Sequence, residues 1–188
     1  MRAAVKLIDR LLRINGGLFE FSQEPGVILR VQLRRQKYPV TIGNQTISKG
    51  DLVIAIHLWN ERVPKIPEAG ADLKWALNLR RSLISSFKGV AKLIMEDPRC
   101  LDARAVAGVS ALFSSTEHIG GMQMIQRMGF TVLPYHRPLG RFGEFWENLF
   151  SWWLMWTYNT NSLNSRKFWR LKRTEIWMTR EEFLTRYG

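Results

Sequence analysis

The fold is organised around the stretch KGDLVIAIHLWNERVP, residues 49–64. A turn signal, Lys49-Gly50-Asp51, precedes the uninterrupted apolar run LVIAIHL, and such a run is typical of a central strand that is covered on both faces. Polar side chains then gather between His57 and Arg62, where the strand ends. We therefore expect a buried strand with a polar cluster at its carboxyl end, a position typical of the mouth of a pocket.

Alternating and helical patterns on both sides of this stretch complete the fold. Before it, residues 27–35 alternate like a half-buried strand, and VTI and QTI flank the hairpin signal Gly43-Asn44. After it, the patterns predict a helix over 73–95, a strand over 105–113, a helix from Ser115 or Thr116 to Gly129, a strand over 131–133, a helix over 142–158, a strand over 169–178 and a closing helix with the capping box Thr179 and Glu182. This order favours an α/β (α+β) fold: one domain, 1–188, with a mixed sheet, an N-terminal hairpin and packed helices.

Composition points to an anionic partner and away from metal chemistry. The chain has 188 residues, 46% of them apolar, and a formal net charge of +12. A positive charge of that size favours nucleic acid, lipid headgroups or an acidic polymer as partner. The single cysteine, Cys100, excludes an internal disulfide and a cysteine-based zinc site, and three histidines argue against a multi-histidine metal site. We expect neither a metal nor a cofactor.

The N-terminal segment 1–15 predicts a basic amphipathic helix. On a helical wheel one narrow arc holds its polar side chains: Arg2, Lys6, Asp9, Arg10 and Arg13. The remaining positions are apolar, and Asn15-Gly16-Gly17 ends the helix. Two interpretations stay open at this point. The helix lies on an anionic membrane, or it packs its apolar face on the protein's own sheet. No segment has the roughly 20 apolar residues needed to span a bilayer.

The polar cluster after the central strand supplies the candidate site. His57 is a candidate general base, and Glu61 is placed to orient it or to accept a proton. The structural alternative is a hydrogen-bonded core histidine and a glutamate paired with a nearby arginine. Arg80 falls near the middle of the predicted apolar stripe of helix 73–95, where it needs a partner. That partner is either Asp51 or Glu61, or a bound anionic ligand. The candidate ligand-binding set is therefore Asp51, His57, Asn60, Glu61 and Arg80.

The last third of the chain combines tryptophan with positive charge. Six of the eight tryptophans lie between residues 146 and 177, and five cations occupy eight positions: Arg166, Lys167, Arg170, Lys172 and Arg173. Tryptophan beside lysine and arginine is typical of a membrane interface, with Trp152, Trp153 and Trp156 as the inserting side chains. Two alternatives remain: the aromatic residues form core, or they stack on single-stranded nucleic acid.

The central stretch also resembles a known family. KGDLVIAIHLWNE is similar to the Gly-Asp…His-Leu-x-Asn signature of the YkoP-like domain, with Gly50, Asp51, His57, Leu58 and Asn60 at the matching positions. AVAGVSALF…MGF and the closing EIWMTREEFLTRYG resemble its later layout. That bacterial domain occurs alone or appended to polysaccharide deacetylase-like proteins. The resemblance implies an α/β domain in a cell-envelope or glycan context, and it implies no catalytic residue.

Together these observations predict a non-catalytic accessory protein at the membrane surface. We expect it to bind anionic lipid headgroups or a lipid-linked anionic glycan in cell-envelope metabolism, with a protein partner over the tryptophan-rich helix as a further option. We expect a cytoplasmic location, peripheral on the inner membrane surface. One alternative is a small-molecule enzyme that uses His57, Glu61 and Arg80 on an anionic substrate. The other is a single-stranded nucleic-acid-binding module.

Overall fold

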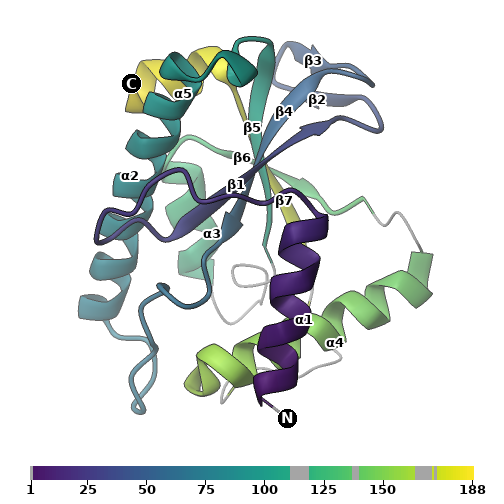
Figure 1. The fold of residues 1–188 in the computed structure, drawn as a ribbon. Coiled ribbons are helices and arrows are strands. Elements are labelled where there is room, and N and C mark those ends of the chain that lie inside the picture. The colour runs from purple at the N-terminus through teal and green to yellow at the C-terminus, as the bar shows by residue number, and fades with distance from the viewer. Residues whose placement is uncertain (1, 111–118, 137–139, 164–170, 172) are drawn as a thin grey trace.

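The computed structural model of residues 1–188 describes all positions except 1, 111–118, 137–139, 164–170 and 172. Its elements, in chain order, are α1 (Arg2–Asn15), β1 (Leu29–Arg35), β2 (Val40–Ile42), β3 (Gln45–Ile47), β4 (Leu52–Leu58), α2 (Leu73–Glu96), η1 (Pro98–Cys100), β5 (Ala103–Ser110), α3 (Ile119–Arg127), β6 (Thr131–Pro134), α4 (Gly140–Tyr158), η3 (Thr160–Leu163), β7 (Thr174–Thr179) and α5 (Arg180–Tyr187). Figure 1 shows the helices arranged around a twisted sheet. The predicted α+β class with a mixed sheet and a hairpin is confirmed.

The sheet places β4 at its interior. Its strand order is β1-β4-β5-β7-β6, and β2 and β3 form a separate two-stranded sheet. β4 and β5 run parallel, whereas the pairs β1–β4, β5–β7 and β6–β7 are antiparallel. β4 covers the whole predicted run LVIAIHL, and four successive residues, Val53–Ile56, are buried. A strand covered on both faces needs no polar positions, which is why its sequence does not alternate.

One face of the sheet carries the main core. Helices α2, α3 and α5 cover it, as Figure 1 shows on the left. Phe87 of α2 stacks against Phe130 at 5.1 Å, Phe183 at 5.9 Å and Tyr187 at 5.1 Å between ring centroids. The predicted capping box of α5 is present: the Thr179 side chain accepts from the Glu182 backbone N–H, and the Glu182 side chain accepts from Thr179 N–H.

The opposite face is covered in two parts. The β2–β3 hairpin covers one end and packs Val40, Ile42 and Ile47 against Val53 of β4 and Trp177 of β7. Beyond the other end of the strands lie α1 and α4, which contact each other (Figure 1). A pocket lies between these two helices and the strands.

Helix α2 corrects one sequence prediction. Its buried side chains are Leu79, Leu83, Ser86, Phe87, Val90, Ala91 and Ile94, whereas Leu73 is 75% exposed and Leu77 is 45% exposed. Later positions of the predicted stripe, Leu83, Phe87, Ala91 and Ile94, are buried, but the first turns of α2 extend beyond the core. Arg80 is consequently exposed. The prediction of a buried, obligatorily paired guanidinium at this position is wrong.

Two strand boundaries also differ from the alternating patterns. β1 begins at Leu29, although the predicted strand begins at Val27 and both Val27 and Ile28 are buried. The Ile28 N–H donates to Ser86 Oγ of α2 at 2.8 Å instead of to a neighbouring strand. β7 begins at Thr174. Leu171 and Arg173 precede it outside the strand, and residues 169, 170 and 172 of the predicted strand lie outside the described residues. The predicted caps Ser115 and Thr116 lie outside the described residues.

Candidate functional site

The pocket lies between the sheet, α1 and α4, where β4 ends. Its volume is about 330 Å³, near the lower end of the range for small-molecule sites. The elements that line it are far apart in sequence: Asp9, Leu12, Arg13 and Leu18 come from α1 and its end, Arg30 from β1, His57, Leu58 and Asn60 from the end of β4, Val109 and Ser110 from β5, and Phe150, Ser151, Leu154 and Met155 from α4.

A chain of ion pairs forms the polar side of the pocket. Arg13 lies 3.4 Å from Asp9 Oδ2 and 3.5 Å from Glu61 Oε1, and Arg30 lies 3.3 Å from Glu61 Oε2 and 3.0 Å from Glu20 Oε1. Arg30 is 4% exposed and also stacks over the Trp59 ring at 4.3 Å from the centroid. This chain fastens α1 to the strands, and both of its arginines already have carboxylate partners.

Two acid–base groups in the pocket are strongly affected by burial. Burial, with the positive charge of Arg34, lowers the pKa of His57 to about 4, so the ring is neutral at pH 7. Its Nε2 is buried and has no hydrogen-bond partner among the described residues. Burial raises the pKa of Asp9, and the neighbouring Arg13 opposes that rise. Asp9 Oδ2 accepts no hydrogen bond within the described part of the chain, despite its ion pair.

The structure brings together only part of the predicted ligand-binding set. His57 and Asn60 both line the pocket, and Glu61 lies behind it as the partner of Arg13 and Arg30. Asp51 precedes the opposite end of β4, about 20 Å from His57 at 3.3 Å per residue, and accepts from Ser48 N–H at 2.7 Å. Arg80 is on the exposed side of α2 and does not line the pocket.

Sequence reasoning missed the residues that α1 and β1 contribute. Asp9 is the only acid on the basic arc of segment 1–15, and that isolated negative charge was the available signal for an internal contact. Arg30 lies on the alternating strand opposite His57 in the β1–β4 register. The alternating pattern of 27–35 predicts a half-buried strand, whose polar positions face solvent, and nothing local shows that α1 and α4 cover that end of the sheet.

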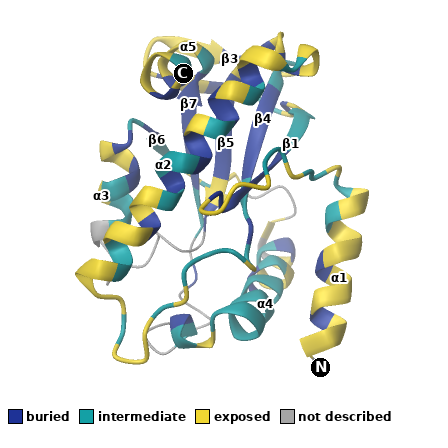
Figure 2. Ribbon diagram, turned by 60° about the vertical axis from the view of Figure 1, so that its left-hand side comes forward, coloured by how far each residue is buried: buried dark blue, intermediate teal, exposed yellow. Residues whose placement is uncertain are grey.

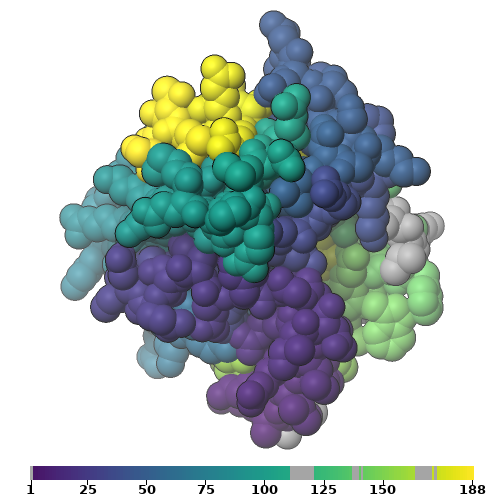
Figure 3. Space-filling view, turned by 45° about the horizontal axis from the view of Figure 1, so that its top comes forward, coloured from purple at the N-terminus to yellow at the C-terminus, as the bar shows by residue number. Residues whose placement is uncertain are grey.

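Helix α1 packs on the protein in an unexpected orientation. Its buried residues are Val5 and Asp9. Its polar side faces α4, with Arg2 over the Trp156 ring at 4.9 Å and Lys6 over the Tyr158 ring at 5.7 Å. Its aliphatic side chains instead face outward: Leu7 is 58% exposed, Ile8 41%, Leu11 51%, Leu12 53% and Ile14 65%. Figure 2 shows α1 exposed along most of its length, and Figure 3 shows it at the surface of the molecule. The interpretation that α1 packs its apolar face on the sheet is therefore wrong.

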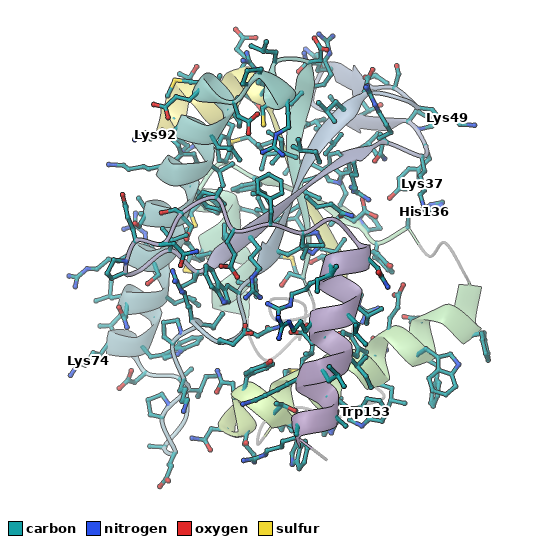
Figure 4. The ribbon with its side chains drawn as sticks, viewed as in Figure 1. Lys37, Lys49, Lys74, Lys92, His136 and Trp153 are labelled. Carbon is teal, nitrogen blue, oxygen red and sulfur yellow. The ribbon has the colours of Figure 1, made fainter. Side chains whose placement is uncertain are left out.

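The predicted tryptophan surface is largely engaged within the protein. Trp152, Trp153 and Trp156 are half-buried, and Trp153 lies on α4 where that helix passes α1 (Figure 4). The exposed aromatic side chains of α4 are at its other end: Phe142 is 74% exposed, Phe145 41% and Trp146 51%.

The cations of the last third are only partly described. Arg173 forms an ion pair with Glu147 and donates to Ser151 Oγ at 2.8 Å, so its charge is compensated. Arg166, Lys167, Arg170 and Lys172 lie outside the described residues. Elsewhere, Lys37, Lys49, Lys74 and Lys92 lie at the periphery, away from α1 (Figure 4). The positive charge is therefore spread over the surface.

Within the described ranges, no three metal-ligating side chains come together, and no helix has the length and hydrophobicity that crossing a bilayer requires.

Comparison with known proteins identifies one family. Searches of curated proteins and of solved structures give no significant match. The family model of the YkoP domain matches residues 1–187, nearly the whole chain. The motif around β4 thus belongs to a match that includes α1, the sheet and α4 together. The protein is a member of the YkoP domain family.

Proposed function

We propose that this protein is a peripheral membrane protein that binds anionic lipid surfaces through the outward face of α1. The outward face comprises Leu7, Ile8, Leu11, Leu12 and Ile14. The observation that supports this proposal is the orientation of α1, whose apolar side chains are exposed while its polar side contacts the protein. A protein that folds by burying apolar surface has no internal reason to hold a helix this way.

The energetics favour a bilayer as the occupant of this face. Moving a half-exposed aliphatic side chain from water to hydrocarbon is worth about 1 kcal/mol, and the outward face has five such side chains. Cations near an anionic leaflet each add about 1 kcal/mol. Arg10 is exposed beside the outward face, and the net charge of +12 attracts the whole molecule to such a surface. A basic amphipathic helix lying in the interface matches this arrangement.

The proposal includes a non-catalytic accessory role in cell-envelope metabolism. The accessory role rests on the glycan and cell-envelope context that the family resemblance implies. A lipid-linked glycan is a candidate ligand in that role. The enzyme alternative in its predicted form needed Arg80 beside His57, and Arg80 lies on the exposed side of α2. A nucleic-acid module is supported by the net charge and by the pairing of tryptophan with cations in the last third, four of whose five cations lie outside the described residues.

Flotation on vesicles tests the membrane proposal. The purified protein is mixed with vesicles of phosphatidylglycerol and phosphatidylcholine, or of phosphatidylcholine alone, and centrifuged through a sucrose gradient. We expect the protein in the floating fraction with anionic vesicles, and less of it there as salt is raised. Absence from both floating fractions at low salt would refute membrane binding. Two other occupants are distinguished in parallel: a dimer by sedimentation equilibrium without lipid, and nucleic acid by salt-dependent oligonucleotide binding.

A further inference from the structure

We propose that the pocket between α1, α4 and the end of β4 binds a neutral amphiphile. Its uncharged, hydroxyl-bearing head would contact His57 and Asn60, and its hydrocarbon chain would lie along Leu12, Phe150 and Leu154. This is a second site beside the membrane face, and it concerns one bound molecule instead of a bilayer surface.

Hydrogen-bonding groups without partners indicate the head group. His57 Nε2 is buried and has no hydrogen-bond partner among the described residues, and both His57 and the half-buried Asn60 line the pocket. Asp9 Oδ2 is also buried without a hydrogen-bond partner among the described residues, and it lines the same pocket; other such atoms, Gln36 Nε2 and Oε1 among them, lie elsewhere in the protein. Buried polar groups are normally paired, so an unpaired set at a cavity is a signature of a ligand. Hydroxyl groups both donate and accept, and they match an imidazole and an amide together.

The charge of the site favours an uncharged head. Around the pocket, three carboxylates, Asp9, Glu20 and Glu61, meet two guanidiniums, Arg13 and Arg30, and the charge of a third, Arg34, acts on His57. An anionic head would have to displace a carboxylate from an arginine, and neutral His57 offers it no positive charge. The pocket therefore selects against phosphate or sulfate.

The walls of the pocket indicate the hydrocarbon chain. Leu12, Leu58, Val109, Phe150, Leu154 and Met155 form a largely apolar lining. Leu12 belongs to both surfaces, because it lines the pocket and is 53% exposed on α1. The apolar wall thus continues into the outward face, and a chain that enters the pocket has a continuous apolar path along the helix.

Octyl glucoside, below its critical micelle concentration, is the probe that tests this site. It carries an uncharged hydroxylated head on an eight-carbon chain and is titrated into the protein by calorimetry without any membrane. Glucose supplies the head alone, and octyl sulfate supplies the same chain with an anionic head. We expect saturable one-site binding of octyl glucoside, and at least tenfold weaker binding of glucose and octyl sulfate.

Variants then locate the binding site. His57→Phe and Asn60→Ala are made separately, so that a folding defect in one leaves the other informative, and each should weaken octyl glucoside binding at least tenfold. Leu7→Gln/Leu11→Gln, which alters only the outward face, should leave it unchanged. The proposal is overturned by no saturable binding, by equal or tighter binding of octyl sulfate, or by binding that both pocket variants retain. Because no vesicle is present, failure of membrane binding would leave the pocket result standing, and the reverse also holds.

Discussion

Replacing Leu7 and Leu11 together with glutamine separates membrane binding from folding. The two residues are one helical turn apart on α1, and they are 58% and 51% exposed in the free protein. Full burial of a leucine side chain is worth about 1.5–3 kcal/mol, so the exposed halves contribute about 1 kcal/mol each on transfer to lipid. The double variant should lose about 2 kcal/mol of binding, a decrease of about 30-fold in the partition coefficient.

The same substitution should leave the folded state nearly unchanged. Glutamine has almost the helix propensity of leucine, and neither side chain is packed, so we expect the free energy of unfolding to stay within about 0.5 kcal/mol. Partitioning is measured by co-sedimentation with sucrose-loaded vesicles that contain phosphatidylglycerol, and unfolding by urea titration.

A matched control exists on α2. Leu73 and Leu77 have the same spacing on a helix and are 75% and 45% exposed, so Leu73→Gln/Leu77→Gln removes similar apolar surface from another part of the molecule. That variant should bind vesicles like the wild type. Equal losses in both double variants would mean that the protein adheres through general hydrophobicity. A loss of several kcal/mol of stability in the α1 variant would mean that its leucines are packed, and the inferred orientation of the helix would then be wrong.

Three further predictions concern the pocket and the fold. The pKa of histidine is 6.5 in the unfolded chain, whereas that of native His57 is about 4. As the pH falls through this interval, the wild type should therefore lose up to about 3 kcal/mol of stability relative to His57→Gln, measured by urea titration at several pH values. Parallel pH profiles of the two proteins would contradict this. Glu61→Gln removes the carboxylate that Arg13 and Arg30 share. Trypsin should then cleave α1 faster at Arg10 and Arg13, while the rest of the chain stays resistant. An unchanged cleavage rate would show that the ion pairs do not hold the helix. Gly129→Ala should destabilise the protein by more than about 1 kcal/mol, because φ is +94°, a backbone conformation that residues with a side chain rarely adopt. A melting temperature equal to that of the wild type would refute the strain.

Local signals were sufficient for much of the fold. The hairpin around Gly43-Asn44, the strand Leu52–Leu58 and the capping box of Thr179 with Glu182 are each present. In each case residues only a few positions apart determine the backbone geometry, so the sequence contains the needed information within a short window. Gly129, placed after α3, likewise has the positive φ expected of a glycine that follows a helix.

The error at Arg80 shows where periodicity is insufficient. Leu73 and Leu77 are in phase with Ile84 and Phe87. Because they were counted in the predicted apolar stripe, Arg80 fell near its middle. In the structure the first turns of α2 extend beyond the core, with Leu73 and Leu77 exposed, and burial begins at Leu79. A periodic pattern gives the direction of an apolar stripe, but only the neighbouring elements determine which part of the helix they cover.

The pocket depends on contacts that sequence patterns do not contain. His57 and Asn60 could be placed at the end of a strand, because strand and turn signals are local. Asp9 and Arg30, however, come from segments 48 and 27 residues before His57. Their roles follow from the orientation of α1, and the helical wheel leaves that orientation open because it fixes one face relative to another and not relative to the protein.

The orientation of α1 and the charges of the pocket have one physical cause in common. Asp9 is a lone acid among the arginines of an amphipathic helix, and it directs the polar side of α1 toward the protein. The linked ion pairs Asp9–Arg13–Glu61–Arg30–Glu20 hold that side in place. Once the polar side is held inward, the leucines on the other side must face outward, since a helix cannot present both faces to the sheet. The ion pairs that neutralise the arginines of the pocket are therefore the same contacts that leave the apolar face of α1 free for a membrane.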